Sequence, residues 1–532
     1  MSYSSQELWE RFQKYYYYYP NIDLALDLSR MDLVDDFFEK MSPHAQRAFA
    51  EMEALEAGAI ANPDENRMVG HYWLRNPSLA PSTAIREQIE SAIDQVRTFA
   101  ADIHSGRVQG QGGIFKNYLL IGIGGSALGP QFLAHALGNP RDRMKPFFLD
   151  NTDPNGMWRV LQTIYTELNQ TLCIVISKSG ATKETRNGML EAKAAFARAG
   201  LDFGKHAVAI TQKNSQLDNL AVEESWIARF PMWDWVGGRT SETSVVGMLP
   251  AALQGFEFVE CLTGAKLCDE VTRAKSVRRN PAMLMALAWF SAVEGTGKKN
   301  MVVIPYRDRL ELLSKYLQQL IMESLGKELD RSGKPVYQGI TVMGNKGATD
   351  QHSYIQQIRD GVKNSFVVFI EVLEDGIKSK VNVESGFTSG DYLNGFYLGT
   401  RQALYENGRL SLTITIRNVT ATSIGALIAI FERAVGYYAA LTNINAYHQP
   451  GVEAGKKAAG SILILQRNIL DFLGSTNGDR FTCQQIAKAI KRESETEHIY
   501  KICNHLESND IISIHRSQNQ TPATDQFYYV GK

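Results

Sequence analysis

Short apolar runs alternate with helical patterns along most of the chain. In the first half the apolar runs cover residues 117–122, 147–149, 172–176 and 206–211, and stretches with helical spacing separate them. Runs of this length are typical of buried strands. Strands that alternate with helices predict a parallel sheet covered by helices on both faces. We therefore expect a first α/β domain over residues 111–295.

A second series of the same kind begins at about residue 300. Its apolar runs cover residues 300–305, 339–343, 366–370 and 410–416. A helical pattern at about 309–328 lies within the series, and two long helical patterns follow near 422–445 and 451–474. These features predict a second α/β domain over residues 296–474.

The two ends of the chain differ from this pattern. Residues 1–110 are mostly helical or irregular in pattern and are expected to pack on the core, with the tyrosine run 15–19 as packing surface. Residues 475–532 contain two short helical patterns followed by two short apolar runs, 511–514 and 527–530. This order predicts a small α+β module similar to a winged helix. Nucleic-acid binding is one use for such a module, but an appended packing or interaction element is the simpler expectation.

Composition narrows the class of protein without identifying it. The 532 residues are 44% hydrophobic and 21% charged, with a net charge of −1, so no overall charge draws the chain to nucleic acid or to an anionic membrane. We expect no transmembrane span, since no apolar run approaches about 20 residues. The N-terminus has no signal-peptide pattern, and the five cysteines are scattered and odd in number. These features predict a cytoplasmic protein.

One polar loop lies at the end of a predicted strand and the start of a helical pattern. Residues 177–182 read S-K-S-G-A-T and follow the apolar run 172–176. Free backbone N–H groups and the helix dipole favour an anion at such a place. Ser177, Lys178, Ser179 and Thr182 are therefore candidate phosphate-binding residues. Alternatively, the hydroxyls cap the helix and bind nothing.

A glycine-rich loop, G-I-G-G-S-A at 122–127, ends an earlier strand. It fits the G-x-G-x-x-A form of a dinucleotide-binding turn, with Asp150 near the end of the next strand. However, loops at the carboxyl ends of parallel strands gather in one crevice. We therefore favour a single phosphate held by two loops, with Gly125 and Ser126 in the first.

Four other positions carry groups that suit catalysis. Arg239 follows two glycines and could stabilise developing negative charge, Glu323 lies at the edge of a helix's apolar stripe and could be a general base, and His352 lies in a polar loop. Lys456 shares a helix face with Val452. Taken singly, each is as readily an ordinary surface residue. No H-E-x-x-H pattern and no clustered Cys and His indicate a metal site.

Taken together, the ordered motifs resemble one family. G-I-G-G-S, S-K-S-G-A-T-K-E-T, V-G-G-R, M-E-S, D-Q-H and Q-P-G-V-E-A-G-K occur in the order typical of the glucose-6-phosphate isomerase family, and the likeness extends from about 65 to about 475. The resemblance implies two sugar-isomerase (SIS) domains, each a parallel sheet flanked by helices. It also implies interconversion of glucose 6-phosphate and fructose 6-phosphate through ring opening and a cis-enediolate, without a metal or cofactor.

The resemblance also implies roles for individual residues. Glu323 would move the proton between C2 and C1, and Arg239 would stabilise the enediolate. His352 would assist ring opening, Lys456 would act at the ring oxygen or hydroxyl, and Gln449 would contact the substrate. The family's histidine comes from the neighbouring subunit, which implies a homodimer with composite sites.

Two positions depart from the family pattern. Thr240 replaces an aromatic residue, and Pro450 stands where many members have Trp; both bear on fine substrate preference.

Two alternative functions remain. A non-catalytic sugar-phosphate sensor would need the phosphate loops without the base Glu323. An NAD(P)-dependent oxidoreductase would use the Gly122–Ala127 turn for a dinucleotide.

Overall fold

The computed structural model describes residues 4–376, 381–476, 478–515 and 521–529, and the side chains of 453, 454, 456 and 457 lie outside this description. The chain divides into two compact units, residues 1–448 and 449–532. We had expected four parts. The larger unit contains both α/β halves together with the N-terminal segment, and the smaller unit contains the last long helix as well as the tail.

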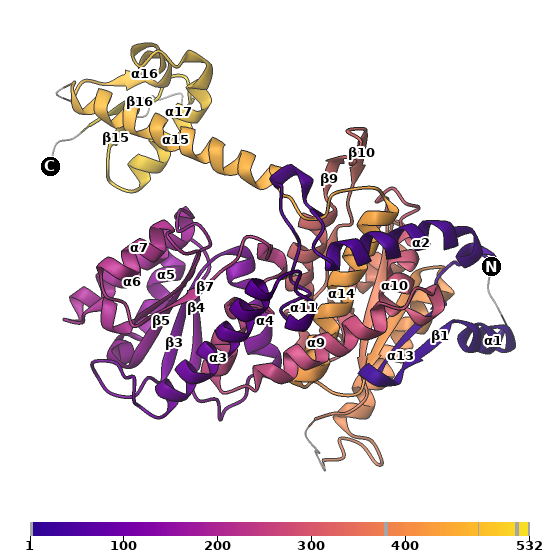
Figure 1. Cartoon of the computed structure of the whole chain (residues 1–532). Coiled ribbons are helices and arrows are strands. Elements are labelled where there is room, and N and C mark those ends of the chain that lie inside the picture. The colour runs from indigo at the N-terminus through magenta and orange to yellow at the C-terminus, as the bar shows by residue number, and fades with distance from the viewer. Residues whose placement is uncertain (1–3, 377–380, 477, 516–520, 530–532) are drawn as a thin grey trace. The chain divides into compact units, whose positions relative to one another are not determined.

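The first half of the larger unit is built on a five-stranded parallel sheet (Figure 1). The strands, in spatial order, are β4 (Lys145–Leu149), β3 (Asn117–Ile121), β5 (Thr171–Ile176), β6 (Ala207–Thr211) and β7 (Ala228–Pro231). Every neighbouring pair is parallel, so all the strand carboxyl ends share one edge. The predicted parallel sheet is confirmed.

Alternate residues of these strands belong to two different cores. The odd-numbered positions of β3, such as Leu119 and Ile121, pack with one set of helices, and Tyr118 and Leu120 pack with another. The first set is α5 (Pro154–Thr163), α6 (Lys183–Arg198) and α7 (Gln216–Glu223), and the second includes α3 (Thr83–His104) and α8 (Val245–Gln254). Burial on both faces explains why the strands are continuous apolar runs.

The second half is built on a six-stranded mixed sheet. Its strands, in spatial order, are β1 (Tyr16–Tyr19), β2 (Leu24–Arg30), β13 (Leu410–Ile416), β12 (Ser365–Val372), β8 (Asn300–Pro305) and β11 (Val342–Met343). The last four strands are mutually parallel, as predicted. The hairpin β1–β2 adds antiparallel to β13. Most of the tyrosine run is therefore an edge strand, which follows α1 (Ser5–Tyr15).

Helices cover both faces of this sheet as well. On one face lie α12 (Ile355–Asp360) and α13 (Ser389–Glu406), and on the other α2 (Phe37–Glu56), α9 (Phe258–Thr272), α10 (Pro281–Ala292) and α14 (Ala421–Leu441). Contrary to our expectation, α14 is long and apolar enough to cross a membrane by length and composition. Within the protein 89% of its apolar window is buried, as is typical of a core helix.

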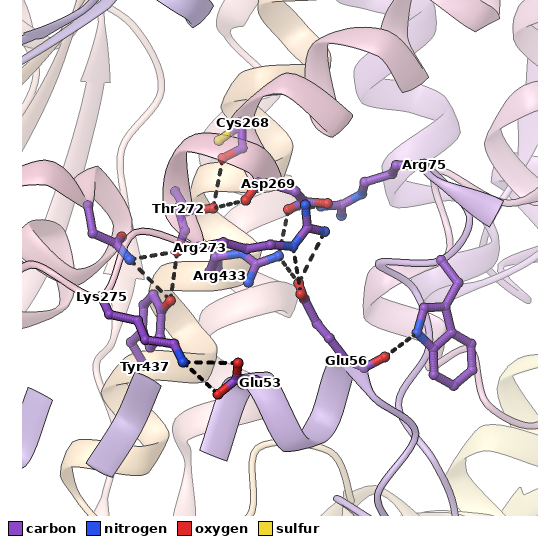
Figure 2. Close-up of polar contacts among 12 residues, drawn as sticks. Glu53, Glu56, Arg75, Cys268, Asp269, Thr272, Arg273, Lys275, Arg433 and Tyr437 are labelled. Carbon is purple, nitrogen blue, oxygen red and sulfur yellow. Dashed lines mark hydrogen bonds and ion pairs between the residues drawn. The ribbon is translucent and has the colours of Figure 1, made fainter. Parts of the chain in front are cut away.

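A buried network of ion pairs joins α2, α9 and α14 (Figure 2). Arg433 on α14 pairs with Asp269 on α9 at 3.0 Å and also with Glu56 at the end of α2. Arg75 pairs with the same Asp269 at 3.1 Å and with Glu432. The side chains of Arg75, Arg433 and Glu432 are fully buried, so each charge depends on its partners.

The smaller unit has its own apolar core. Helix α15 (Pro450–Gly474) contributes Leu465, Ile469 and Leu473, which belong to one cluster with Ile486 and Phe527 of the tail. The tail consists of β14 (Phe481–Thr482), α16 (Cys483–Ala489), α17 (Thr496–Ser508), β15 (Ser513–His515) and β16 (Gln526–Tyr528). Its two helices and antiparallel β15–β16 pair have the predicted winged-helix-like order, and β14 adds a third strand.

Candidate active site

Two of the predicted loops lie side by side at the carboxyl edge of the first sheet. Strands β3 and β5 are neighbours, with Ile121 opposite Val175, so the loops that follow them meet. Ser177 is buried at the end of β5, where its Oγ accepts a hydrogen bond from the Gly180 N–H at 3.1 Å and donates to Thr182 Oγ1 at 3.3 Å. The loop is therefore held in shape by its own hydroxyls.

The simple helix-cap interpretation does not describe this loop. Thr182 occupies the N-cap position of α6, but its side chain makes no capping bond in the described structure. Ser179 is exposed, and its Oγ accepts from the Ala181 N–H at 3.2 Å. Gly180 has φ +72°, and a Cβ there would lie 2.3 Å from the backbone nitrogen of Leu217. The turn therefore requires glycine, and the uncapped N-terminus of α6 suits an anion.

Lys178 connects this loop to the segment that precedes Arg239. Its Nζ donates to the carbonyl oxygens of Asp234 at 3.1 Å and Val236 at 3.2 Å. Burial lowers the pKa of Lys178 to about 8, against the opposing effect of the Asp234 carboxylate 3.7 Å away. The lysine is thus a partly desolvated cation beside the serine loop.

The glycine-rich loop packs directly on the segment that carries Arg239. A Cβ at Gly125 would lie 1.9 Å from the carbonyl oxygen of Gly238, so only glycine fits this approach. Ser241 Oγ lies 3.3 Å from the Gly125 carbonyl oxygen and 2.7 Å from that of Gly238. Ser126, partly exposed, ends this short turn and lies within the same loop.

The acidic residue that a dinucleotide-binding turn would require is engaged elsewhere. Asp150 Oδ2 accepts a hydrogen bond from Gln131 Nε2 at 2.7 Å. Gln131 lies on α4 (Leu128–Leu137), the helix that follows the glycine-rich loop. The Asp150 carboxylate is therefore bound to the protein's own helix, which disfavours a ribose-binding role.

Arg239, which is buried, and Glu323, which is partly buried, form an ion pair between the two α/β halves. Arg239 lies in the short turn η7 (Gly238–Thr240), and its Nε is 3.4 Å from Glu323 Oε2, with side-chain exposures of 6% and 17%. The guanidinium also donates to the carbonyl oxygens of Ala446 at 2.7 Å and His448 at 3.4 Å. The cation is thus fixed by backbone on one side and by the candidate base on the other.

Glu323 is the last residue of a π-helical segment. This segment, η10 (Gln318–Glu323), continues the helix α11 (Leu313–Leu317). Wide turns of this kind are frequent at functional sites. Near the start of the segment, Gln319 packs on Gly124: a Cβ at Gly124 would lie 3.1 Å from Gln319 Nε2. The helix that carries Glu323 therefore contacts the glycine-rich loop.

A buried lysine that we did not select from the sequence lies behind Glu323. Lys327 begins β9 (Lys327–Leu329), which pairs with β10 (Pro335–Gln338), and its Nζ donates to the Glu323 carbonyl oxygen at 2.7 Å. Burial and the Arg239 cation lower the pKa of Lys327 to about 8, with the Glu323 carboxylate opposing. The four-residue spacing from Glu323 was the available sequence signal.

The other three predicted residues lie on other elements of the chain. His352 is exposed in the turn η11 (Thr349–His352), and no hydrogen bond or ion pair among the described residues joins it to Arg239 or Glu323. Gln449 is the N-cap residue of α15, in the smaller unit. Lys456 lies within the same helix, and its side chain lies outside the described residues.

The described residues also bear on metal binding. Among them, no group of three or more His, Cys, Asp or Glu side chains is arranged to hold a metal ion. The positive groups gathered at the site are Arg239, Lys178 and Lys327. The arrangement is therefore an anion-binding edge next to a cation–carboxylate pair, which suits proton transfer on a phosphorylated substrate.

Comparison with known families agrees with this arrangement. The family model described as phosphoglucose isomerase matches residues 27–393 and 397–479. The chain belongs to the phosphoglucose isomerase family. The match begins at residue 27, earlier than the start near residue 65 that the motifs predicted, and it ends at 479, close to the predicted end near 475.

Individual relatives of this family are similar over nearly the whole chain. A glucose-6-phosphate isomerase of Geobacter sulfurreducens is 59% identical over 508 residues, 95% of this chain and 96% of that protein. One of Geotalea daltonii is 56% identical over 526 residues, 99% of each chain. Such coverage includes nearly all of the tail after residue 475, for which the motifs had suggested no counterpart.

Solved structures show the same fold. The crystal structure of a glucose-6-phosphate isomerase from Chlamydia trachomatis superposes with a TM-score of 0.79, at 26% identity, over 87% of this chain and 92% of that chain. A Thermus thermophilus protein of undefined function superposes with a TM-score of 0.68 at 28% identity, over 83% of this chain and 99% of that chain. The predicted family and fold class are confirmed.

Proposed function

We propose that this protein interconverts glucose 6-phosphate and fructose 6-phosphate. The observation that carries the proposal is the ion pair of Arg239 Nε and Glu323 Oε2, 3.4 Å apart. A base beside a fixed cation is what aldose–ketose isomerisation requires. Membership of the phosphoglucose isomerase family and relatives named glucose-6-phosphate isomerase support the assignment.

The phosphate group of the substrate would bind at the carboxyl edge of the first sheet. Ser126, Ser177, Ser179 and Thr182 would contribute hydroxyls, Gly125 would bring its backbone close, and the uncapped N-terminus of α6 would contribute N–H groups. Lys178 would supply positive charge at the side of the loop. Binding a remote phosphate in this way holds the sugar so that its C1 and C2 face the base.

Ring opening would precede proton transfer. In our proposal His352 and Lys456 exchange protons with the ring oxygen and the C1 hydroxyl, and Gln449 contacts the open sugar. Each of these roles rests on the family resemblance of its motif.

Glu323 would then move a proton between C2 and C1. Removal of the C2 proton leaves a cis-enediolate whose negative charge Arg239 stabilises, and return of the proton at C1 gives the ketose. One carbon is oxidised as its neighbour is reduced, so the step balances without an external oxidant or reductant.

The position of His352 supports a homodimer with composite sites. His352 is exposed and shares no bond with Arg239 or Glu323 in the described part of its own chain. We propose that the partner subunit's His352 completes each site. Nucleic acid and membrane are not proposed as partners, and we place the enzyme in the cytoplasm, where phosphosugars are made and consumed.

The sensor alternative is less well supported. A sensor would need the phosphate loops, but it would have no use for the partly buried carboxylate of Glu323 beside the Arg239 guanidinium. Removing water from such a pair costs free energy, and a protein that only binds a sugar phosphate would gain nothing in return. The structural and family similarities are likewise to isomerases.

A coupled assay tests the reaction directly. Fructose 6-phosphate is supplied with an NADP⁺-linked glucose-6-phosphate dehydrogenase as the reporter, in parallel assays with and without EDTA. We expect steady NADPH formation that depends on this protein. No formation by folded protein would contradict the proposed function, and formation lost on adding EDTA would show that a metal is needed.

Subunit mixing tests the composite site. The variants Glu323→Gln and His352→Ala are each expected to be nearly inactive, but a dimer of one chain of each contains one intact site. After equal amounts exchange subunits at random, activity should recover to about a quarter of the wild-type level. No recovery, with exchange verified by mass spectrometry of labelled subunits, would contradict the contribution of His352 across the interface.

A further inference from the structure

A second, fully buried contact joins the same two segments that carry Arg239 and Glu323. Glu242 follows Arg239 closely in the chain, and its Oε1 accepts a hydrogen bond from the Tyr316 hydroxyl at 2.7 Å. Tyr316 lies on α11, which continues into the π-helical segment that ends at Glu323. Both residues are 3% exposed. The contact therefore lies inside the protein, where it does not meet substrate.

Each partner of this hydrogen bond is held by close packing. A Cβ at Gly129 would lie 2.7 Å from Glu242 Cβ, and one at Gly247 would lie 2.0 Å from the Glu242 carbonyl oxygen. The Tyr316 ring stacks on Phe132 of α4, with centroids 5.7 Å apart and planes at 15°. Because the Glu242 backbone and the Tyr316 ring are closely packed, the hydrogen bond between the two side chains couples the position of one segment to that of the other.

The buried carboxyl has no function of its own in the proposed reaction. Burial raises the pKa of Glu242 to about 7, while the Tyr316 hydroxyl and backbone N–H act to lower it. An acidic group in an apolar interior is costly unless its hydrogen bonds are made. Well-packed hydrophobic residues of similar volume are often at least as stable as a buried polar pair, so this pair requires another explanation.

We propose that Glu242 and Tyr316 are positioning residues, whose hydrogen bond fixes the turn of Arg239 against the helix of Glu323 and so sets the cation–base separation. This inference rests on the proposed isomerase function. Arg239 comes from the first α/β half and Glu323 from the second, so small relative shifts of the halves would separate them. An error of about 1 Å in such a geometry can lower a rate by up to about 100-fold.

The test compares kcat and KM of matched tyrosine and glutamate variants. Tyr316→Phe removes the hydroxyl and is expected to lower kcat about tenfold or more, with KM within about twofold of wild type. Glu242→Gln keeps an oxygen that accepts the same bond, and is expected to keep most of the activity. Tyr118→Phe is the control, because Tyr118 is also fully buried and donates to Gln254 Oε1 at 3.0 Å, but at the amino end of β3.

Three outcomes of these kinetic measurements would overturn the proposal. One is wild-type kcat in Tyr316→Phe, and a second is an equal loss in Tyr118→Phe that follows a drop in melting temperature. The third concerns the double variant Glu242→Met/Tyr316→Phe. If the two residues act through one bond, this variant should lower kcat little further than either single variant. Additive losses in kcat would contradict a shared bond.

A crystal structure of Tyr316→Phe gives a readout that does not depend on activity. The Arg239–Glu323 separation should be longer than in wild-type crystals, and an unchanged separation would overturn the positioning role. An inactive wild-type protein with a lengthened separation in the variant would instead refute the proposed isomerase function and leave the positioning role standing.

Discussion

The side-chain amine of Lys327 donates a hydrogen bond to the backbone carbonyl of Glu323 at 2.7 Å. A buried cation thus lies directly behind the proposed base and beside Arg239. Its charge would stabilise the anionic enediolate relative to the neutral open-chain sugar. The site therefore has a second cation whose protonation is adjustable near neutral pH, in contrast to the permanently charged guanidinium.

Lys327→Met should lower kcat about tenfold or more, because it keeps the apolar stem and removes the charge. The matched control is Lys334→Met, an exposed lysine beyond the same strand, which should leave kcat unchanged. Steady-state kinetics with fructose 6-phosphate check both. Equal activity of the two variants would show that Lys327 has a structural role only.

The same lysine predicts the direction of the pH dependence. Because burial lowers the pKa of Lys327 to about 8, its charge is present below that pH and is lost as pH rises through it. Wild-type kcat should fall above about pH 8, and this fall should be absent from Lys327→Met. Lys178 also has a pKa lowered to about 8, by burial, but its loss of charge should raise KM, so separate profiles of kcat and KM distinguish the two.

Glu323→Gln should lower kcat by about 100-fold to 10,000-fold with KM little changed, since it removes the proton acceptor and keeps the shape. Exposed Glu328, on β9, provides the control Glu328→Gln, for which wild-type kinetics are expected. Exchange of the substrate C2 proton with solvent deuterium offers a second readout. Continued exchange in Glu323→Gln would assign the base to another group.

Replacing Ser177 and Thr182 together by alanine should raise KM for the phosphosugar about tenfold or more, with a smaller change in kcat. The two hydroxyls contact each other at 3.3 Å and shape the proposed phosphate loop. Thr263→Ala, on exposed α9 surface, is the control. A KM equal to wild type in the double variant would place the phosphate elsewhere.

The ion network of Figure 2 should matter for stability more than for chemistry. Asp269→Ala leaves Arg75 and Arg433 buried with less compensation and should cost about 3–5 kcal/mol of unfolding free energy. Asp94→Ala, which breaks the exposed pair with Arg97, should cost less than about 1 kcal/mol. Urea unfolding followed by circular dichroism measures both; equal losses would contradict the importance of burial.

The repeating part of the fold was readable from the sequence because each parallel strand is buried on both faces. Runs such as 172–176 are continuous apolar segments, and the helices between them follow their own period. The hairpin of β1 and β2 was not found. Its tyrosines gave no alternation, and its place in the sheet depends on β13, far away in the chain.

The candidate site was also predictable from the sequence only in part. The loops were predictable, since each lies where a strand ends and a helix begins, and the packing of Gly125 on Gly238 brings them together. Lys327 was missed because its importance depends on the burial of its side chain, and its neighbours in the sequence resemble an ordinary turn. The Glu242–Tyr316 contact joins two halves of the chain, so no local pattern could have indicated it.

The pairing of β2 with β13 also has a consequence for how the protein is made. The N-terminal hairpin leaves the ribosome early, but the strand that covers its open edge ends at Ile416 and emerges only after most of the chain has been synthesised. Until then, Leu24 to Leu28 present an apolar strand with unpaired backbone groups. Nascent chains that stall before residue 416 should therefore be prone to association, and should depend on chaperones that shield exposed strand edges.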